Sequence, residues 1–196
     1  MRETTGDGRP SREGPSPRPL LLFLIGYRGS GKSSTARAVA ALLGARVLDT
    51  DALIEEDCGQ TIAEVFAARG EAAFRACESA VLARVIGEWR EASVPLVVAT
   101  GGGIVLDPAN VARMRTRGRV VWLRAGVEVL RSRIARDPRS GASRPALRGS
   151  SSVDEVDELL CAREPLYRAA AHQVVDTDGL KVPEVARIIV ESLHGD

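Results

Sequence analysis

Residues 20–33 read LLLFLIGYRGSGKS, and this stretch decides the fold class. The apolar run at 20–25 has the length and composition of a strand that is buried on both faces. The motif GYRGSGKS fits the pattern G-x-x-x-x-G-K-[ST], and the alanine-rich segment 32–43 is typical of a helix. Strand, glycine-rich turn and helix in this order predict a P-loop, which binds the phosphates of a nucleoside triphosphate.

Each part of the predicted P-loop has a physical role. Its glycines let backbone N–H groups converge on phosphate oxygens, and the helix N-terminus adds a favourable dipole. Lys32 can reach the β- and γ-phosphates, and the Ser33 hydroxyl can ligate Mg²⁺. A chance match is the alternative, and the flanking strand and helix disfavour it. The candidate ATP-binding residues of this loop are Gly29, Ser30, Gly31, Lys32, Ser33 and Ser34.

Two carboxylates follow the second apolar segment. The segment ARVLD predicts a strand that ends at Asp49, and Asp51 lies two residues further on. Like charges this close destabilise one another unless a cation lies nearby. Beside a P-loop the two carboxylates would face Mg²⁺, Lys32 and the group that accepts the phosphoryl, so the pair favours chemistry. The alternative is structural, an aspartate that caps a helix starting at Ala52.

The rest of the chain alternates strands and helices. Segments typical of strands lie at 95–100, 118–124 and 172–177, and segments typical of helices at 70–90, 127–136, 152–171 and 182–193. Capping patterns mark helix starts at Thr61 with Glu64, at Asp107 with Pro108, and at Ser152 with Glu155. This alternation predicts an α/β fold of the P-loop kinase kind, a five-stranded parallel sheet flanked by helices.

Composition bounds the remaining organisation. Residues 1–19 are rich in Gly, Pro, Ser and Arg and predict a disordered tail, whereas 20–196 predict a single domain. The net charge of +1 gives no reason to expect binding to nucleic acid or membranes. The apolar run at 20–25 is too short to span a bilayer. Three scattered cysteines are typical of a reducing compartment, so we expect a cytoplasmic protein.

Three later features suggest a site for a second ligand. Arg75 lies on a predicted helix, glycines 101–103 end the third predicted strand, and Arg163 lies in the segment REPLYRAAA. Open α/β sheets bind ligands at the carboxyl ends of their strands, where the glycines lie. Each feature also has a structural interpretation. Arg75 can pair with Glu71 or Glu78 on an exposed helix face, three glycines can form a tight turn, and Arg163 can be an exposed charge.

The order of these motifs resembles that of the shikimate kinases. Five segments besides the P-loop stand in the order and approximate spacing of that family: LDTDALIE, GEAAFRACE, TGGGIV, SRPAL and REPLYRAAA. The resemblance covers residues 20–193 and implies ATP-dependent phosphorylation of the 3-hydroxyl of shikimate, in the biosynthesis of chorismate and aromatic amino acids. Mg²⁺ would be the cofactor, ATP and shikimate the ligands, and the chain a monomer. A mobile lid would lie at about 137–152 and a shikimate-binding region at about 51–90.

The resemblance implies roles on the acceptor side. Asp51 would hold the shikimate hydroxyls and orient the attacking 3-hydroxyl. Arg75 and Arg163 would bind the shikimate carboxylate, which suits the fork of donors on a guanidinium. The loop residues Gly101, Gly102 and Gly103 would offer backbone amides to the substrate, and Phe66, Phe74 and Glu78 would shape the pocket.

The resemblance also implies roles on the nucleotide side. The predicted catalytic residues are Lys32, Asp51 and Arg144. Arg144 would contact the phosphates from the lid. Asp49 would act on Mg²⁺ through water, beside the metal ligand Ser33. Arg136 would stack on adenine, and Lys181 would contact the nucleotide from the C-terminal loop.

Two other interpretations stay open at this point. Another small-molecule P-loop kinase, such as a gluconate kinase, would share the P-loop and an aspartate after the second strand. It gives no reason for Arg75, glycines 101–103 and Arg163 to occur together. A catalytically silent relative would be expected to lack Lys32, Asp51 or Arg163, and all three are present.

Overall fold

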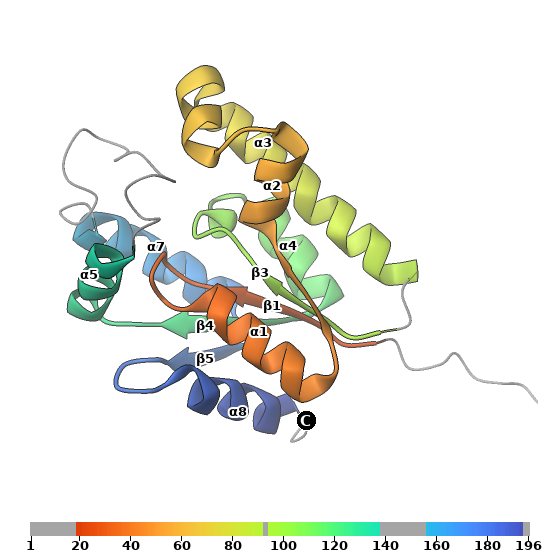
Figure 1. Ribbon diagram of the computed structural model, residues 1–196, viewed down its shortest axis with the longest axis vertical. Helices are drawn as coiled ribbons and strands as arrows, with labels where there is room; N and C mark the ends of the chain where they lie inside the picture. Colours follow the sequence, from red (N-terminus) through yellow and green to blue (C-terminus); the bar gives the residue numbers. More distant parts are fainter. Residues whose placement is uncertain (1–18, 92–93, 138–155, 194–196) are drawn as a thin grey trace, which may run out of the picture.

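A five-stranded parallel sheet forms the centre of the molecule (Figure 1). The computed structural model describes residues 19–91, 94–137 and 156–193. Its strands are β1 (Leu21–Ile25), β2 (Arg46–Asp49), β3 (Leu96–Ala99), β4 (Arg119–Arg124) and β5 (Gln173–Asp176), in the spatial order β2-β3-β1-β4-β5. Every neighbouring pair is parallel. The five strands and their parallel arrangement are therefore confirmed.

The central strand β1 is buried along its whole length, and its side chains enter two different cores. Leu21, Phe23 and Ile25 pack into one core, and Leu22 and Leu24 pack into the core on the opposite face of the sheet. This arrangement explains the uninterrupted apolar run, because a strand with helices on both of its faces has no solvent-facing side.

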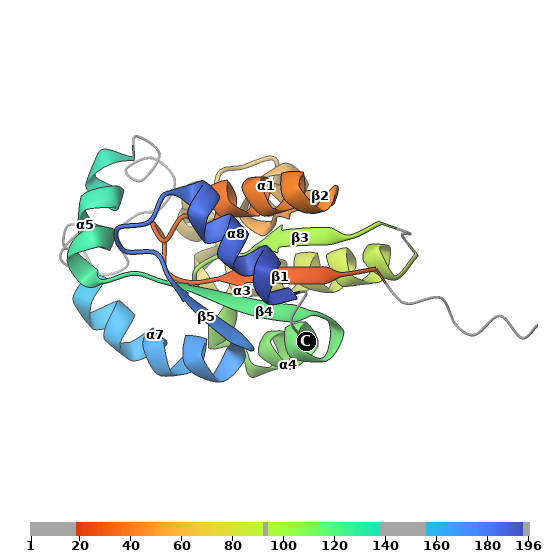
Figure 2. The same ribbon diagram turned by 90° about the horizontal axis from the view of Figure 1, so that it is seen from below.

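Helices cover both faces of the sheet (Figures 1 and 2). One face packs against α1 (Lys32–Leu43) and α8 (Val182–Leu193). The other packs against α2 (Thr50–Cys58), α3 (Ile62–Glu91), α4 (Pro108–Arg117) and α7 (Val156–Ala170). A smaller core joins α5 (Val127–Arg136) to α7 beneath Tyr27. No helix in the described ranges combines the length and apolarity that a membrane crossing needs.

Two predicted capping patterns are confirmed. The Asp107 carboxylate accepts a hydrogen bond from the Ala109 N–H at 2.8 Å and caps α4. At the start of α3, the Thr61 N–H donates to Glu64 Oε2 at 2.7 Å, and the Glu64 N–H donates to Thr61 Oγ1 at 3.3 Å. Each side chain thus satisfies a backbone donor that the first helical turn leaves without an intrahelical partner.

One predicted helix start is wrong and another is confirmed. Helix α2 begins at Thr50 rather than at Ala52, because Asp49 Oδ1 accepts from the Asp51 N–H at 3.0 Å and caps the helix two residues earlier. The helix predicted to begin at Gly70 is confirmed, because the range of α3 contains two helical segments that meet at a kink where Gly70 has non-helical dihedral angles (φ 77°, ψ 173°). The short 3₁₀ helix η1 (Ile104–Leu106) was not predicted.

Several predictions concern residues outside the described ranges. The tail predicted at 1–19 lies there except for Pro19, and the lid predicted at 137–152 except for Asp137. Arg144 and the cap predicted at Ser152 lie there too, so α7 is described only from Val156 onward.

The parallel sheet places the predicted functional segments at one edge. Strand β1 leads into the P-loop, β2 ends at Asp49, and β3 leads into Gly101. Because all strands run the same way, their carboxyl ends meet at that edge, which is where open α/β sheets bind ligands. Segments more than 50 residues apart in the chain are thereby brought together.

Candidate active site

The P-loop turns from β1 into α1 through backbone conformations that favour glycine. Gly29 has a φ of 79°, and Gly31, which caps α1, has a φ of 92°. Residues other than glycine rarely adopt these φ values. The turn itself therefore explains why the motif has glycines at these positions. The Lys32 ammonium donates to the carbonyls of Gly26 and Tyr27 at 2.8 and 2.9 Å, which places its charge over the loop.

A cleft of about 430 Å³ opens beside the P-loop. Many of the predicted site residues line it: Gly29, Gly31, Lys32, Ser33, Ser34, Asp49, Asp51 and Gly102. Ser30 instead is buried, with 2% of its surface exposed, and its N–H closes the turn by donating to the Tyr27 carbonyl at 3.2 Å. The nucleotide segment and the two aspartates therefore share one cavity.

Asp49 joins the P-loop helix to α2. The Ser33 hydroxyl donates to Asp49 Oδ2 at 2.6 Å, while Asp49 Oδ1 caps α2. The capping interpretation and the functional one are thus compatible, because the two carboxylate oxygens have different partners. Asp51, in the first turn of α2, lines the same cleft.

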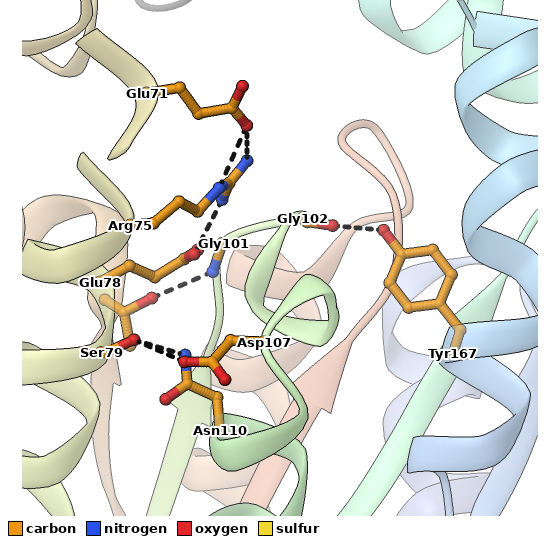
Figure 3. Close-up of polar contacts among 10 residues, drawn as sticks. Glu71, Arg75, Glu78, Ser79, Gly101, Gly102, Asp107, Asn110 and Tyr167 are labelled. Atoms are coloured by element: carbon orange, nitrogen blue, oxygen red, sulfur yellow. Dashed lines mark hydrogen bonds and ion pairs between the residues drawn. The ribbon is translucent and has the colours of Figure 1, made fainter. Parts of the chain in front are cut away.

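Arg75 belongs to a partly buried ion-pair cluster rather than to an exposed helix pair (Figure 3). Its guanidinium donates to Glu78 Oε2 at 2.8 Å and to Glu71 Oε1 at 3.1 Å, and the Glu78 side chain is only 1% exposed. Burial lowers the pKa of the Arg75 guanidinium, but the charges and hydrogen bonds of Glu78 and Glu71 outweigh burial and raise this pKa above its usual value. Arg75 is therefore charged and fixed in position.

Two aromatic rings lie beneath the same arginine. The Arg75 guanidinium carbon is 5.2 Å from the centroid of the Phe74 ring, and the Phe66 and Phe74 ring centroids are 4.6 Å apart. Of the three side chains that the resemblance assigned to one pocket, Phe74 and Glu78 contact Arg75 directly, and Phe66 packs behind them on Phe74.

Glycines 101–103 form a tight turn, in which the Ile104 N–H donates to the Gly101 carbonyl at 3.3 Å, and close approach requires glycine at positions 101 and 103. None of the three has a positive φ. A Cβ atom at Gly101 would lie 2.6 Å from Glu78 Oε1 and 2.7 Å from Asp51 Oδ1, and one at Gly103 would collide with the Arg75 guanidinium. The missing side chains at Gly101 and Gly103 leave room for the Asp51 and Glu78 carboxylates and for the Arg75 guanidinium.

Two buried hydroxyls hold this glycine loop, defined as residues 101–103. The Gly101 N–H donates to Thr50 Oγ1 at 3.0 Å, and the Tyr167 hydroxyl donates to the Gly102 carbonyl at 2.5 Å (Figure 3). The Gly101 amide is thus used within the protein. In the described part of the chain, the amides of Gly102 and Gly103 donate to no protein acceptor.

A polar network fixes α3 against the segment after the glycine loop. The Ser79 hydroxyl donates to Asp107 Oδ2 at 3.1 Å, and the Asn110 amide donates to Ser79 Oγ at 2.9 Å (Figure 3). Asn110 is 1% exposed. The helix that carries Arg75 is thereby tied to the residues that follow the loop.

Arg163 approaches the P-loop from α7. Its guanidinium carbon lies 5.8 Å from the centroid of the Tyr27 ring, which is a cation–π distance. The side chain is half-buried. Arg163 is therefore not the fully exposed charge of the structural alternative.

Two residues predicted on the nucleotide side do not line the cleft. Arg136 ends α5 and is exposed, whereas Arg133, one turn earlier, does line the cleft. Arg133 donates to the Gly29 carbonyl at 3.4 Å and to the Thr177 carbonyl at 3.0 Å. Lys181 is exposed at the start of α8, where its backbone N–H donates to Glu184 Oε2 at 2.7 Å.

Thr50, Arg133 and Tyr167 are functional candidates that the sequence did not single out. Each had a signal in a motif already quoted or predicted. Thr50 stands between the two aspartates, Tyr167 is four residues after Arg163, and Arg133 lies on the helix predicted at 127–136. Such residues act through contacts with other residues, and the sequence alone does not show those contacts.

Comparisons with known proteins agree on one family. The family model described as shikimate kinase matches residues 28–194. Shikimate kinase 2 of Yersinia pestis (strain Pestoides F) is 41% identical over 176 residues, which cover 89% of this chain and 96% of the relative. The shikimate kinase of Halorhodospira halophila is 42% identical over 177 residues, covering 90% and 95% of the two chains.

A solved structure agrees with the sequence relatives. It is described as shikimate kinase from Acinetobacter baumannii in complex with shikimate, and it is 33% identical to this chain. It superposes with a TM-score of 0.81 and covers 90% of this chain and 94% of its own. The P-loop, the acidic pair and the glycine loop beside a partly buried arginine therefore lie in a chain whose sequence and fold both match one family: the chain belongs to the shikimate kinase family.

Proposed function

We propose that this chain transfers the γ-phosphoryl group of ATP to the 3-hydroxyl of shikimate and releases shikimate 3-phosphate and ADP. The single observation that carries the proposal is the convergence, in a member of this family, of the P-loop, Asp51 and the glycine loop on one cleft. Phosphoryl transfer needs positioning and charge neutralisation more than covalent help from the protein. The residues brought together here supply those two things.

On the nucleotide side, the N–H groups of residues 29–34 would hold the phosphates at the start of α1. Lys32 would place its positive charge against the β- and γ-phosphate oxygens, where negative charge develops during transfer. Arg133 adds a second cation at the rim of the same loop, through its contact with the Gly29 carbonyl. Arg136, Arg144 and Lys181 stay predictions for nucleotide contacts.

A magnesium ion fits the residues next to the P-loop. The Ser33 hydroxyl and the Asp49 carboxylate are oxygen donors 2.6 Å apart, and Mg²⁺ prefers oxygen ligands. In the ranges 19–91, 94–137 and 156–193, no three His, Cys, Asp or Glu side chains group to hold a metal. Phosphate oxygens and water would therefore complete its coordination. Bound Mg²⁺ neutralises charge that develops on the phosphates.

On the acceptor side, Asp51 would orient the 3-hydroxyl toward the phosphate. Arg75 and Arg163 would bind the carboxylate of shikimate through paired donors. The amides of Gly102 and Gly103 would donate to the same molecule. Because Glu78 and Glu71 fix the Arg75 guanidinium, little ordering of that side chain would oppose binding.

The direct test is ADP release measured with and without shikimate. We expect ADP release to require shikimate, and gluconate not to replace it. Shikimate should also raise the melting temperature of the protein by mass action, and gluconate should leave it unchanged. ADP release that gluconate stimulates and shikimate does not would identify another small-molecule kinase. Tight ATP binding without turnover on either acceptor would identify a catalytically silent protein.

The Asp49→Asn variant tests the metal role. The amide keeps the size of the side chain and can still accept from the Ser33 hydroxyl, but it removes the charge beside the ion. We expect kcat/KM at low Mg²⁺ to fall by about 10- to 100-fold, the scale for residues that support a metal site. Raising Mg²⁺ should restore part of the loss, as a steady-state rate series over Mg²⁺ concentration would measure. A defect that no Mg²⁺ concentration changes would place Asp49 outside the metal site.

We propose that residues 1–18 contribute to neither folding nor catalysis. The first described contact of β1 is made by Leu20, whose carbonyl accepts from the Leu96 N–H at 2.8 Å. Deletion of 1–18 should therefore leave the kcat and the melting temperature unchanged. A longer deletion through residue 22 is the matched control, because it removes the buried Leu21 and Leu22 and should prevent folding. A large effect of the shorter deletion would contradict the proposal.

We further propose that the chain works as a monomer in the cytoplasm. Cys58, Cys77 and Cys161 are all free thiols in the structure, as a reducing compartment favours. Sedimentation across a concentration series would test the first statement and cell fractionation the second.

A further inference from the structure

The Tyr167 hydroxyl reaches the glycine loop from a different part of the chain. Tyr167 lies on α7, is completely buried, and stacks its ring on Trp122 with centroids 5.7 Å apart. Its hydroxyl donates to the Gly102 carbonyl at 2.5 Å, across 65 residues of sequence. A buried tyrosine needs only one such partner for its hydroxyl, so the contact alone is ordinary. The contact also affects the direction of the next backbone amide, the N–H of Gly103.

A peptide unit is planar, and in the trans form its C=O and N–H point in opposite directions. No peptide bond among the described residues is cis. The Gly102 carbonyl and the Gly103 N–H belong to the same unit. Holding that carbonyl toward Tyr167 therefore turns the Gly103 N–H away from Tyr167.

Arg75 lies on the side of the glycine loop away from Tyr167. In Figure 3, Tyr167 and Arg75 lie on opposite sides of the Gly102 carbonyl. Gly103 itself touches the arginine, since a Cβ atom there would collide with the guanidinium. The amide and the guanidinium are thus neighbouring donors.

A second hydroxyl holds the other end of the loop. Thr50 is completely buried, and its Oγ1 accepts from the Gly101 N–H at 3.0 Å. The loop also packs against the P-loop: an ideal Cβ at Gly102 would lie 3.4 Å from the Gly26 carbonyl oxygen and 3.5 Å from the Arg28 nitrogen. The Gly101 carbonyl, which shares a peptide unit with the Gly102 N–H, accepts from the Ile104 N–H at 3.3 Å. Because Thr50 holds the preceding unit and Tyr167 the following one, the amides of Gly102 and Gly103 have defined directions.

We propose that Tyr167 and Thr50 are positioning residues for the acceptor site, which set the orientation of the Gly102 and Gly103 amides beside Arg75. The proposal rests on the proposed function, because the acceptor is shikimate. Arg163 lies one helical turn before Tyr167, so one segment of α7 both carries a donor for the acceptor and holds the loop. Tyr167 and Thr50 themselves touch no reacting atom.

Without either hydroxyl the loop keeps its sequence but loses a directing partner. The Gly102 carbonyl, or the Gly101 N–H, would then be buried with one hydrogen bond fewer, and the peptide would rotate to recover it. Rotation of the peptide would turn the glycine N–H away from the acceptor site beside Arg75. Shikimate binding should weaken, while ATP, bound by a separate loop, should not be affected.

The test compares Tyr167→Phe, which keeps the ring and its stacking on Trp122, with wild type. We expect KM for shikimate to rise about three- to tenfold, the scale of one hydrogen bond, and KM for ATP to stay unchanged. The shikimate-induced rise in melting temperature should shrink, and that induced by ADP should not. Loss of active protein through instability would lower kcat only, because KM does not depend on how much enzyme is folded.

Thr50 provides a second, independent variant. Thr50→Val has nearly the same shape without the hydroxyl and should raise KM for shikimate in the same way, whereas Thr50→Ser keeps the hydroxyl and should not. Ser192→Ala is the matched control: it removes a hydroxyl that donates to Gln173 Oε1 at 2.7 Å, between α8 and β5. It should leave both KM values unchanged.

The outcomes separate the two proposals. If wild-type protein shows no shikimate-dependent ADP release, the proposed function is wrong. If wild type is active but Tyr167→Phe and Thr50→Val have the wild-type KM for shikimate, only the positioning role is wrong. Equal increases of KM for ATP and shikimate would also overturn it, because they would indicate a general disturbance of the cleft.

Discussion

Replacing Lys32 by alanine should abolish phosphoryl transfer. Lys32 follows the last glycine of the P-loop, and its ammonium lies within 2.9 Å of two loop carbonyls, where the phosphates of ATP would bind. Charge that develops on the transferred group would then have no ammonium beside it. Removal of one preorganised donor of this kind costs about 10²- to 10³-fold in kcat, and loss of a full charge should cost at least the upper value.

No other lysine is placed to replace it, because the only other one in the chain, Lys181, lies at the start of α8. A coupled assay of ADP release at saturating ATP and shikimate measures the effect. Arg117→Ala is the matched control: it also removes one cation, but from the C-terminus of α4, ahead of β4 and away from the carboxyl edge. Wild-type activity of the Lys32 variant would mean that this P-loop is not the catalytic one.

The sheet could be predicted because its signals are local. The run 20–25 is apolar at every position, and β1 proves to be buried on both faces, as a central parallel strand must be. The P-loop needs three glycines with positive φ between a strand and a helix, Gly26, Gly29 and Gly31, and that requirement appears directly as a motif.

The first helix after β2 was misplaced for an equally local reason. Two aspartates could each cap a helix, and sequence does not say which one accepts the backbone N–H. Asp49 does so, and α2 begins at Thr50. This shift changes the surroundings of Asp51, which lies inside the first helical turn and not before it.

The surroundings of Arg75 could not be predicted, because they depend on burial. Glu71 and Glu78 are at helical spacing from Arg75 whether the pair is exposed or not. Only the packing of α3 against the glycine loop buries Glu78 to 1% exposure. The same holds for Tyr167, whose contact with Gly102 joins residues 65 positions apart.

Arg136 was the predicted adenine contact, but Arg133, about one helical turn earlier, is the residue that lines the cleft. Arg133 and Arg136 both lie in the last turn of α5, and no sequence pattern distinguishes them. The difference arises because Arg133 points back to Gly29 and Thr177, which only the fold brings near.

The Asp51→Asn variant should separate binding of the acceptor from its phosphorylation. Asparagine keeps the shape of aspartate and can still accept a hydrogen bond from one hydroxyl, so shikimate binding should weaken only modestly. The negative charge that orients the 3-hydroxyl is lost, and turnover should fall by about two to four orders of magnitude, the scale of a positioned acid–base group. ATP binding should be unchanged, because the P-loop backbone and Lys32 supply it.

The measurement is a pair of titrations, with ATP and with shikimate, and steady-state rates over a Mg²⁺ series. Asp57→Asn makes the same chemical change on the same helix, at an exposed position paired with Arg84 at 2.6 Å, and should keep wild-type rates. Asp51→Asn should differ from Asp49→Asn in one respect, since added Mg²⁺ should not restore its rate. If the rate is normal, or returns with Mg²⁺, then Asp51 is a second carboxylate on the metal side. The next carboxylate to test would then be Glu78, because its Oε1 and Asp51 Oδ1 would lie 2.6 and 2.7 Å from the same ideal Cβ atom at Gly101.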